Sequence, residues 1–484
     1  MTQKDTEIPN HTLASKIAPL HLALLVSVFI IAACGLIYEL AAGAVASYLL
    51  GDSILQFSTI IGCYLFAMGV GSFLTRYFDR HLSAYFLRIE LLVALVGGFL
   101  PSVIFLSNAY FLIYFMVFVV GVLVGLEIPL VMRLLKKNVA LKDLVSEVLT
   151  YDYLGALAVS VAFPLFLVPQ LGLIRTGLVF GLMNAAVAFW ALYLFRFELK
   201  SVKLHLLACV LTFLVLLAGL FFAKDITSLS EDKFYQDKIV LAQTTPYQRI
   251  VLTQQAGEGK TGFRLFLNGN LQFAQRDEYR YHEALVHPIM AAHGAPKKIA
   301  VLGGGDGMAV REILRYPSVE SITLVELDPN MTQLFKSHPD LMQLNGHSLL
   351  SNKVKIINTD AFKWLEESTD YFDVIVVDFP DPTNFNVGKL YTNSFYSLLE
   401  KRLNAGAYAV IQTTSPLIAR QTFWTVAHTI ESVGLQATPY HAHVPSFGEW
   451  GFIIASRRPY RLPTQLPAKL QFLTAQSLPQ LFIF

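Results

Sequence analysis

The residues best able to do chemistry are acids that follow predicted strands in the C-terminal half of the chain. The first strand runs into a glycine loop followed by an acid, and each of the next three ends in or beside a carboxylate. The acids are Asp306, Glu326, Asp360, Asp378 and Asp381. The carboxyl ends of parallel strands meet at one edge of a sheet, so these side chains are expected to lie together. Like charges disfavour each other, and the expected ligand is therefore cationic or rich in hydroxyl groups.

The loop Gly303, Gly304 and Gly305 differs from a dinucleotide-binding turn. Met308 occupies the third glycine position of the G-x-G-x-x-G pattern. Asp306 places an acid where a pyrophosphate requires bare backbone N–H groups. The loop therefore predicts a ligand without a pyrophosphate at this point.

Two further features narrow the ligand and the reaction. Glu326 follows Gly303 by roughly 20 residues, the spacing at which an acid accepts hydrogen bonds from ribose hydroxyls. A nucleoside with a positive charge, such as an adenosyl sulfonium compound, offers ribose hydroxyls to Glu326 and a positive charge to Asp306. In 378-DFPDP-382 the prolines stiffen the segment that carries Asp378 and Asp381. One of these acids is expected to take a proton from an ammonium nucleophile while the other anchors a distant positive charge.

Some of these acids have a simpler interpretation. Asp360 alone is more readily explained as a helix N-cap, and Asp328 fits that role better still because Pro329 follows it. Capping does not explain a set of acids at equivalent strand ends.

The elements that must position the acids alternate between strands and helices. Uninterrupted apolar strands near 299–303, 320–327, 353–359, 372–378 and 407–413 predict a parallel, Rossmann-like sheet in residues 291–460. Before it, residues 239–290 predict a small antiparallel β unit with a two-residue hairpin turn at Asn268-Gly269. Residues 224–238 are expected to be a linker, and 461–484 a C-terminal tail.

Residues 1–223 have a different character. The chain has a mean hydropathy of +0.50, and this half is a series of long uncharged runs that begin near Leu20, Ile54, Tyr85, Tyr110, Thr150, Ile174 and Leu204. Each run is long enough to cross a hydrocarbon core of about 30 Å. The fold class is thus an α-helical multi-pass membrane domain of about seven helices followed by an α/β domain, with the lipid bilayer as a partner.

Composition excludes other classes. The net charge of +2 gives no basic footprint for nucleic acid. The cysteines Cys34, Cys63 and Cys209 all fall in apolar runs without zinc spacing, so no metal site is expected. Homo-oligomerisation stays open.

The soluble half resembles the spermidine synthase-like aminopropyltransferases over about residues 240–456. The resemblance rests on 247-YQRI-250, 268-NGNLQFAQRDEYRYHE-283, 303-GGGDGMAVRE-312, 325-VELDP-329, 359-TDAF-362 and 378-DFPDP-382. It implies a fold of the S-adenosylmethionine-dependent methyltransferase type. It also implies transfer of an aminopropyl group from decarboxylated S-adenosylmethionine to a polyamine amine such as putrescine, with release of methylthioadenosine. No cofactor beyond this co-substrate is implied.

The resemblance also implies roles for individual residues. Asp378 matches the catalytic proton acceptor. The positions implied to hold the donor or methylthioadenosine are Gln248, Glu326, Asp360, Ala361 and Phe385, the last of which replaces a proline common in relatives. The positions implied to surround the amine are Tyr281, His282, Asp306 and Asp381. Gln272 and Asp277 are expected either to join the site or to stabilise the hairpin.

Three questions stay open on the sequence. Segment 444-VPSFGEWGF-452 is closer to the version in thermospermine-type synthases than to that of putrescine-specific relatives, so the amine is not defined. The glycine loop, Glu326 and Asp360 would also serve a methyltransferase. A transporter or polyamine sensor is the third alternative, because Glu39 and Glu127 lie within apolar runs, where carboxylates are costly and often functional.

Two arguments disagree about which side of the membrane the soluble domain faces. Lys and Arg are concentrated near the N-terminus and in the loops around Arg80, Lys137 and Lys200, which predicts a cytoplasmic N-terminus. Seven crossings would then place the soluble domain outside, whereas the resemblance implies a donor made in the cytosol. The conflict is resolved if one run does not cross, if a crossing is hidden between Leu20 and Leu50, or if the domain works outside with imported donor. We expect an inner-membrane protein with a cytoplasmic catalytic domain.

Overall fold

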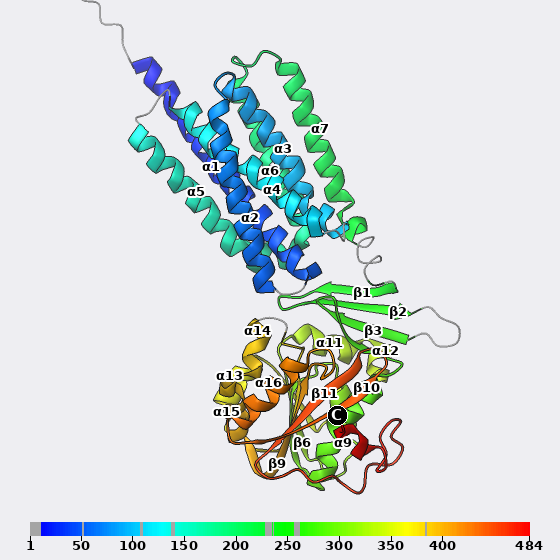
Figure 1. Cartoon of the computed structure of the whole chain (residues 1–484). Coiled ribbons are helices and arrows are strands. Elements are labelled where there is room, and N and C mark those ends of the chain that lie inside the picture. Colours follow the sequence, from blue (N-terminus) through cyan, green and yellow to red (C-terminus); the bar gives the residue numbers. More distant parts are fainter. Residues whose placement is uncertain are drawn as a thin grey trace, which may run out of the picture. The chain divides into compact units, whose positions relative to one another are not determined.

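The computed structural model describes residues 11–50, 53–106, 110–136, 141–227, 235, 237–255, 262–382 and 385–484. The chain divides into two compact units, Met1–Phe234 and Tyr235–Phe484 (Figure 1). The first is called the helical unit, and the second is called the catalytic unit because the resemblance described above places the expected reaction there.

The helical unit consists of long apolar helices, and the seven predicted runs lie on them. They are α1 (His11–Leu50), α2 (Ser53–Leu74), α3 (Leu82–Leu106), α4 (Tyr110–Leu135), α5 (Leu141–Ala162), α6 (Val168–Phe195) and α7 (Val202–Phe221). Because α1 is one continuous helix, the structure contradicts the option of a hidden crossing between Leu20 and Leu50. The start of α1 and the end of α7 lie at opposite ends of the unit (Figure 1).

Helices α5 and α6 are joined more closely than the sequence predicts. The π-helical turn Phe163–Leu167 connects them, and the regular backbone breaks at Gly172, with φ 74° and ψ 170°. By length and composition alone, six helices in the described part of the chain qualify as membrane spans, with Lys142–Phe195 counted as one. The runs near Thr150 and Ile174 are therefore two limbs of one helical stretch, separated by a glycine in a conformation that other residues adopt with difficulty.

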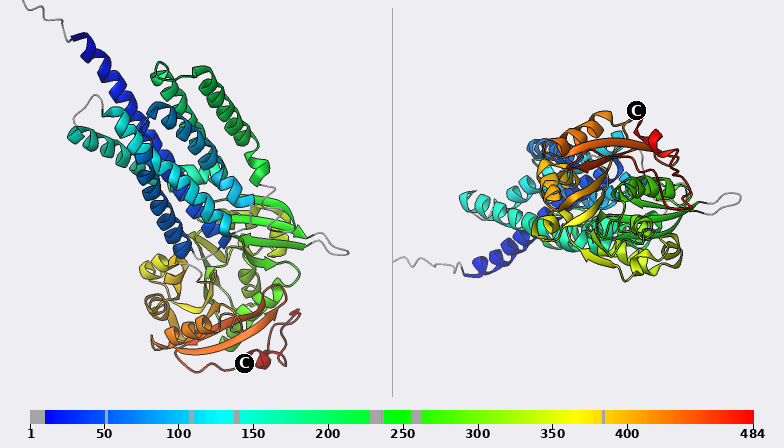
Figure 2. Two further views of the ribbon diagram at one scale, coloured as in Figure 1. Left: turned by 45° about the horizontal axis from the view of Figure 1, so that its top comes forward. Right: turned by 90° about the horizontal axis from the view of Figure 1, so that it is seen from below.

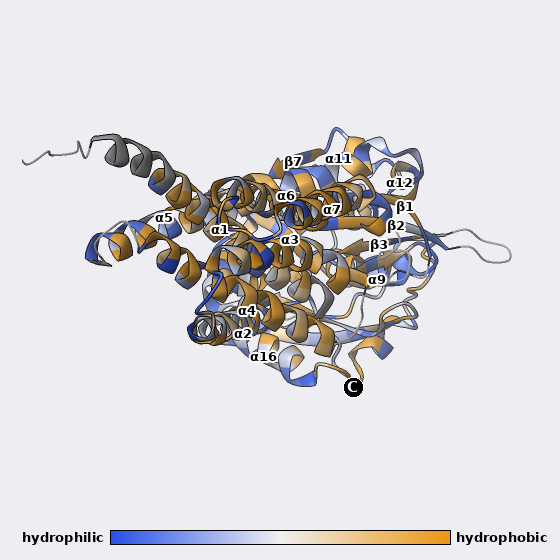
Figure 3. Cartoon of the chain, turned by 90° about the horizontal axis from the view of Figure 1, so that it is seen from above, coloured by the Kyte–Doolittle hydropathy of each residue, from blue (hydrophilic) through white to orange (hydrophobic). Residues whose placement is uncertain are grey.

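Glycines allow the helices of this unit to approach closely. A Cβ on Gly125 of α4 would lie 2.2 Å from the Met68 carbonyl oxygen of α2. A Cβ on Gly181 of α6 would lie 2.8 Å from the Ala94 carbonyl oxygen of α3. Small residues at such contacts are typical of helices that pack in lipid. In Figure 3, most residues of these helices have the orange colour that marks hydrophobic side chains.

The catalytic unit begins with a four-stranded antiparallel sheet in the order β1-β2-β3-β4. Its strands are β1 (Lys238–Thr244), β2 (Arg249–Gln255), β3 (Gly262–Leu267) and β4 (Asn270–Ala274). The predicted hairpin turn is confirmed: Leu267 pairs with Asn270, and Asn268 and Gly269 both have positive φ. Helix α9 (Glu278–His293) follows and packs on the second sheet.

The second sheet has seven strands in the order β10-β11-β9-β8-β5-β6-β7. Five are parallel: β5 (Lys298–Gly303), β6 (Ser321–Glu326), β7 (Val354–Asn358), β8 (Phe372–Asp378) and β9 (Leu403–Thr413). Strands β10 (Gln436–Val444) and β11 (Gly448–Ser456) add an antiparallel edge that the sequence analysis did not predict. The sheet is therefore mixed. Its parallel strands have a Rossmann-like order, with β6 and β7 on one side of β5 and β8 and β9 on the other.

Helices cover both faces of this sheet (Figures 1 and 2). Ile299 and Val301 of β5 face a core shared with α9 and the first sheet, whereas Ala300 and Leu302 face the opposite core. The other helices are α10 (Met308–Ile313), α11 (Pro329–Ser337), α12 (Pro339–Leu344), α13 (Ala361–Glu367), α14 (Phe385–Gly388), α15 (Asn393–Lys401) and α16 (Arg420–Glu431). Short 3₁₀ turns at Thr75–Tyr77, Ser348–Leu350, Lys389–Tyr391 and Leu478–Phe482 complete the elements.

The segment expected to be a C-terminal tail is part of the fold. Leu473, Leu478 and Leu481 belong to the core that α9 and the first sheet share. Glu283 of α9 accepts hydrogen bonds from the backbone N–H groups of residues 471–473 at 2.7, 2.8 and 2.9 Å. The tail is thus fixed to the helix that carries Tyr281 and His282.

Candidate active site

Close packing between strand ends explains the glycine loop. Gly303 pairs with Asp378 on the neighbouring strand, and a Cβ on Gly303 would lie 2.2 Å from the Asp378 carbonyl oxygen. A Cβ on Gly305 would lie 2.7 Å from the side chain of Glu326. Gly303 and Gly304 also have positive φ. Two carboxylate-bearing strand ends therefore crowd the loop: a side chain at Gly303 would collide with the backbone of Asp378, and one at Gly305 would displace Glu326.

Asp378 lies at the centre of a group of polar side chains at this edge. The Tyr281 hydroxyl donates to Asp378 Oδ1 at 2.5 Å. The pKa of Asp378 is raised to about 6, first by burial and then by the neighbouring charge of Asp306, while His282 and the Tyr281 hydrogen bond oppose the rise. A carboxylate with such a pKa is suited to accept a proton near neutral pH. The predicted set Tyr281, His282, Asp306 and Asp378 is brought together, although the roles of its members stay predictions.

Asp306 is buried against the start of α10. Its Oδ1 accepts from the Met308 N–H at 2.9 Å. Burial raises the pKa of Asp306, and the positive charge of His282 and this hydrogen bond lower it. The acid that departs from the dinucleotide pattern therefore lies close enough to His282 and Asp378 to interact with both electrostatically.

Glu326 is held by the backbone at the end of β6. Its Oε2 accepts from the Gly305 N–H at 3.2 Å, and its Oε1 accepts from the Asp328 N–H at 2.9 Å. Burial raises the pKa of Glu326 to about 7. The carboxylate is thus oriented beside the glycine loop, where the sequence analysis places a ribose.

Asp328 and Gln248 connect the first sheet to this edge. Asp328 caps α11 by accepting from the Asn330 N–H, as its sequence context predicts. Its other oxygen accepts from Gln248 Nε2 at 3.1 Å and from the Thr245 hydroxyl at 2.7 Å. Gln248 is therefore placed near the end of β6, beside the predicted donor position.

Asp360 has partners that account for it without a ligand. It caps α13 by accepting from the Phe362 N–H at 2.8 Å, and Lys389 Nζ lies 2.5 Å from its Oδ2. Although burial alone would raise the pKa of Asp360, the Lys389 hydrogen bond and charge together with the backbone N–H groups bring it below its usual value. Ala361 is buried at the first position of α13. Phe385 begins α14, and its side chain lies outside the described part of the structure.

Asp381 faces the end of β9. Its Oδ1 accepts from Gln412 Nε2 at 3.3 Å, and burial raises its pKa. The Tyr391 hydroxyl donates to the Pro380 carbonyl at 3.1 Å, which fixes the segment between Asp378 and Asp381.

Asp277 and Gln272, for which the sequence left two roles open, have different surroundings. Asp277 accepts from the Ser446 N–H at 2.8 Å and from its hydroxyl at 2.6 Å. It therefore ties the start of α9 to the turn between β10 and β11, which lies in the segment 444-VPSFGEWGF-452. Gln272 makes a weak 3.4 Å hydrogen bond to the Asn270 carbonyl within its own hairpin.

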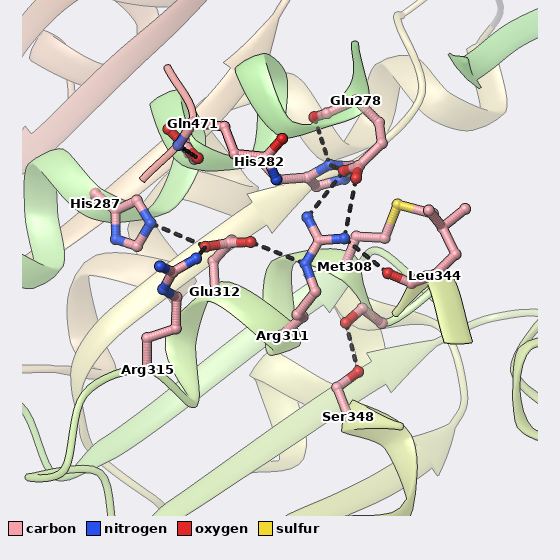
Figure 4. A network of polar contacts seen from close by, with 12 residues as sticks. Glu278, His282, His287, Met308, Arg311, Glu312, Arg315, Leu344, Ser348 and Gln471 are labelled. Atoms are coloured by element: carbon pink, nitrogen blue, oxygen red, sulfur yellow. Dashed lines mark hydrogen bonds and ion pairs between the residues drawn. The ribbon is translucent and has the colours of Figure 1, made fainter. Parts of the chain in front are cut away.

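A buried network behind the site was missed by the sequence analysis (Figure 4). Glu278 accepts from both terminal nitrogens of Arg311 at 3.0 Å, and its Oε2 lies 2.8 Å from His282 Nδ1. Glu312 contacts Arg311 Nε at 2.8 Å and His287 Nε2 at 3.0 Å.

These contacts hold His282 in place beside Asp306. The hydrogen bond and charge of Glu278 raise the pKa of His282 although burial lowers it. The signal was the spacing of Glu278 and His282, four residues apart on a helix, which places both side chains on one face. Nothing in the sequence pairs α9 with Arg311 of α10. Lys389, Tyr391 and Gln412 were missed for the same reason, because each reaches the site from a different element.

The chain is similar to known proteins of one family. Residues 278–464 match the family described as the spermine/spermidine synthase domain. A polyamine aminopropyltransferase of Leptospira interrogans is 50% identical over 467 residues, which cover 96% of this chain and 93% of that one. Polyamine aminopropyltransferase 2 of Ralstonia nicotianae is 50% identical over 475 residues, 95% of this chain and 92% of that one. The chain belongs to the polyamine aminopropyltransferase family.

Its function is polyamine aminopropyl transfer, and it is a transferase of the spermidine synthase type. The similarity extends well beyond Tyr235–Phe484, so these relatives resemble the helical unit as well. Among solved structures, the spermidine synthase from Thermotoga maritima matches with a TM-score of 0.46 and 23% identity, covering 51% of this chain and 84% of that one.

Proposed function

We propose that the catalytic unit transfers the aminopropyl group of decarboxylated S-adenosylmethionine to a primary amine such as putrescine, with Asp378 as the proton acceptor. The amine nitrogen forms a bond to the carbon beside the sulfonium as the carbon–sulfur bond breaks. Methylthioadenosine leaves with the sulfur electron pair, and the amine proton passes to Asp378. The observation that carries the proposal is the contact of Asp378 with Tyr281 beside Asp306, with a pKa of about 6.

The donor and the amine occupy neighbouring positions in this proposal. Glu326, fixed by two backbone N–H groups, binds the ribose, and Gln248 contacts the donor from the first sheet. Asp360 and Ala361, at the start of α13, lie toward the adenine. When the donor binds, Asp360 gives up its contact with Lys389 and contacts the donor instead. Asp306 and Asp381 attract the ammonium groups, because both are acids with raised pKa values that a cation would lower.

Alignment of two substrates accounts for much of the rate in a displacement of this kind. The buried Glu278–Arg311 contact supports that alignment by fixing His282. Methyl transfer is the competing reaction, since Glu326 and the glycine loop would serve either donor. The paired acids of 378-DFPDP-382 favour aminopropyl transfer, because a methyltransferase has no need of two acids for a second ammonium group.

The test uses purified full-length protein with a panel of amines. With decarboxylated donor and the correct amine, mass spectrometry is expected to detect methylthioadenosine and an amine extended by one aminopropyl group. With S-adenosylmethionine itself, no adenosylhomocysteine is expected. Adenosylhomocysteine in the second reaction, with no product in the first, would refute the proposal.

The helical unit is proposed to lie in the inner membrane. Its helices have the length and composition of membrane spans. They also carry large apolar side chains on their outer surfaces, including Phe66 at 67%, Phe111 at 80% and Leu204 at 64% exposure. Such side chains are costly in water and are suited to lipid contact.

The catalytic unit is proposed to face the cytoplasm, where the donor is made. The start of α1 and the end of α7 lie at opposite ends of the helical unit (Figure 1). If all helices cross the membrane and the catalytic unit is cytoplasmic, the positively charged loops lie outside, against the usual charge rule. Reporter fusions after Asp225 and near Lys137 decide between the two arguments. A reporter after Asp225 that is active only outside the cell would refute the cytoplasmic placement.

A further inference from the structure

The helical unit buries polar side chains that the reaction does not use. Glu90 of α3 and Asn184 of α6 are fully buried, and Glu127 of α4 is 1% exposed. Tyr38 of α1 is fully buried as well. Of these four, the sequence analysis noted only Glu127. They are called the buried polar cluster below.

Helix α1 packs against α3, α4 and α6, which carry the rest of the cluster, and a Cβ on Gly97 of α3 would lie 2.6 Å from the ring of Tyr38. Cys34 of α1 donates to the Phe180 carbonyl of α6 at 3.4 Å, one turn before Asn184. The Cys34 thiol interacts electrostatically with both Glu90 and Glu127, and so does the Tyr38 hydroxyl. Glu90 and Glu127 also interact with each other. Acids from α3 and α4 therefore meet beside polar groups from α1 and α6.

Most polar atoms of the cluster have no hydrogen-bonding partner within the described part of the chain. Both carboxylate oxygens of Glu90, Oε1 of Glu127, both amide atoms of Asn184 and the Tyr38 hydroxyl are unpaired there. An unsatisfied buried polar group destabilises a folded protein, and an unpaired buried charge destabilises it more. So many unpaired atoms at one place indicate that their partner comes from outside the chain.

We propose that the buried polar cluster binds a protonated amino group of an aliphatic polyamine. An ammonium group offers three N–H donors, and the carboxylates and the Asn184 oxygen offer acceptors. Apolar side chains of the same core, such as Val93 and Val124, suit the methylene chain. The ring of Tyr38 adds a surface that attracts cations.

Other features of the unit favour an extended amine over a metal ion. Within the described residues, no three His, Cys, Asp or Glu side chains are grouped to hold a metal. A third acid, Glu39, is 9% exposed on α1. The Tyr64 hydroxyl interacts electrostatically with both Glu39 and Glu127. Acidic side chains spread over several helices of the bundle match the spaced amino groups of a polyamine. The choice of this ligand class rests on the proposed function of the catalytic unit, whereas the cluster itself does not.

The experiment separates the two amine sites in the full-length protein. Equilibrium dialysis with radiolabelled spermidine is performed on the Asp378→Asn/Asp381→Asn variant, in which the catalytic amine position is disabled. This variant is expected to retain one bound spermidine per chain. Adding Glu90→Gln and Glu127→Gln is expected to weaken that binding at least tenfold. Asp143→Asn, an exposed acid of the same unit, is the matched control and is expected to change nothing.

Aminopropyl transfer by the Glu90→Gln/Glu127→Gln variant reports whether the chain still folds, and it is expected to stay at the wild-type level. Asn184→Ala provides a second variant that removes no charge, and a several-fold loss of spermidine binding is expected. Spermidine binding that survives all three substitutions would overturn the proposal, as would binding of radiolabelled Na⁺ in its place. If the wild-type chain lacks transfer activity but the cluster binds spermidine, only the proposed function of the catalytic unit fails.

Discussion

Both units of the chain bury carboxylates, but they surround them differently. In the catalytic unit, Glu278 accepts from Arg311, and Glu326 accepts from two backbone N–H groups. Asp378 accepts from Tyr281. In the helical unit, both oxygens of Glu90 lack a partner among the described residues.

The difference indicates two uses of a buried acid. Where the protein supplies the donors, the carboxylate is held in one orientation before any ligand arrives, which is the condition for catalysis by fixed dipoles. Where it does not, the acid depends on a ligand or a proton for compensation. A Glu→Gln substitution is therefore expected to reduce stability more where the protein supplies hydrogen-bond donors to the acid than where it does not.

The largest effect is expected at the proton acceptor. Asp378→Asn preserves the shape of the side chain but cannot accept the amine proton, so turnover should fall by about two or more orders of magnitude. Methylthioadenosine affinity serves as the control and should be retained, because the donor side is intact. Steady-state kinetics with wild-type turnover would show that Asp378 is not the proton acceptor.

The next prediction compares the two units by stability. Glu278→Gln removes one of the two charges that compensate Arg311, together with the ion pair to His282, and is expected to lower the free energy of unfolding of the catalytic unit by about 3 kcal/mol. Glu90→Gln replaces an acid that has no partner among the described residues and is expected to change the stability of the full-length protein by less than about 1 kcal/mol.

Urea unfolding followed by tryptophan fluorescence measures the loss in the catalytic unit, since Trp364, Trp424 and Trp450 lie there. For the Glu90 variant, the signal of Trp190 in the helical unit is the appropriate probe. Equal losses in the two variants would contradict the distinction drawn between the units.

A smaller effect is expected on donor binding. Glu326→Gln replaces one charge-assisted hydrogen bond to a ribose hydroxyl by a neutral one, a loss of roughly 1–2 kcal/mol in methylthioadenosine binding. Titration calorimetry measures it, with Gln272→Ala as a control that leaves the affinity unchanged. If Glu326→Gln binds methylthioadenosine as wild type does, the ribose lies elsewhere.

The smallest effect concerns pH. Asp378 must be ionised to accept a proton, so kcat/KM is expected to fall as the pH drops through about 6. Tyr281→Phe removes a hydrogen bond that lowers the pKa of Asp378, and the acidic limb of the profile should move to higher pH. The shift is expected to be less than about one unit, since such a hydrogen bond is worth roughly 1 kcal/mol. An unchanged or lowered midpoint would indicate that another group controls this limb.

Much of the architecture could be predicted because it follows from local patterns. Asn268-Gly269 specified a hairpin turn, and uninterrupted apolar runs specified the parallel strands. The antiparallel strands β10 and β11 escaped notice because mixed polar and apolar residues between 436 and 456 give no clear period. The tail was missed since Leu473 and Glu283 are far apart in sequence.

In the candidate site too, features that follow from local sequence patterns were predicted, and contacts between distant residues were not. Asp378, Asp306 and Glu326 were found because strand ends in a parallel sheet share an edge. The contacts of Asp360 with Lys389 and of Glu278 with Arg311 were not, because no sequence period links those elements.

By itself, the sequence determined which residue types stand at the strand ends, where the apolar helices run and which family the motifs resemble, since each depends on neighbours in the chain. Tertiary structure alone decided which acids have partners. Whether a buried carboxylate has a donor depends on atoms from other elements at hydrogen-bonding distance, as with Tyr281 beside Asp378, and no local pattern encodes that distance. For Glu90, only the packing of four helices revealed that the chain brings polar groups together without pairing them.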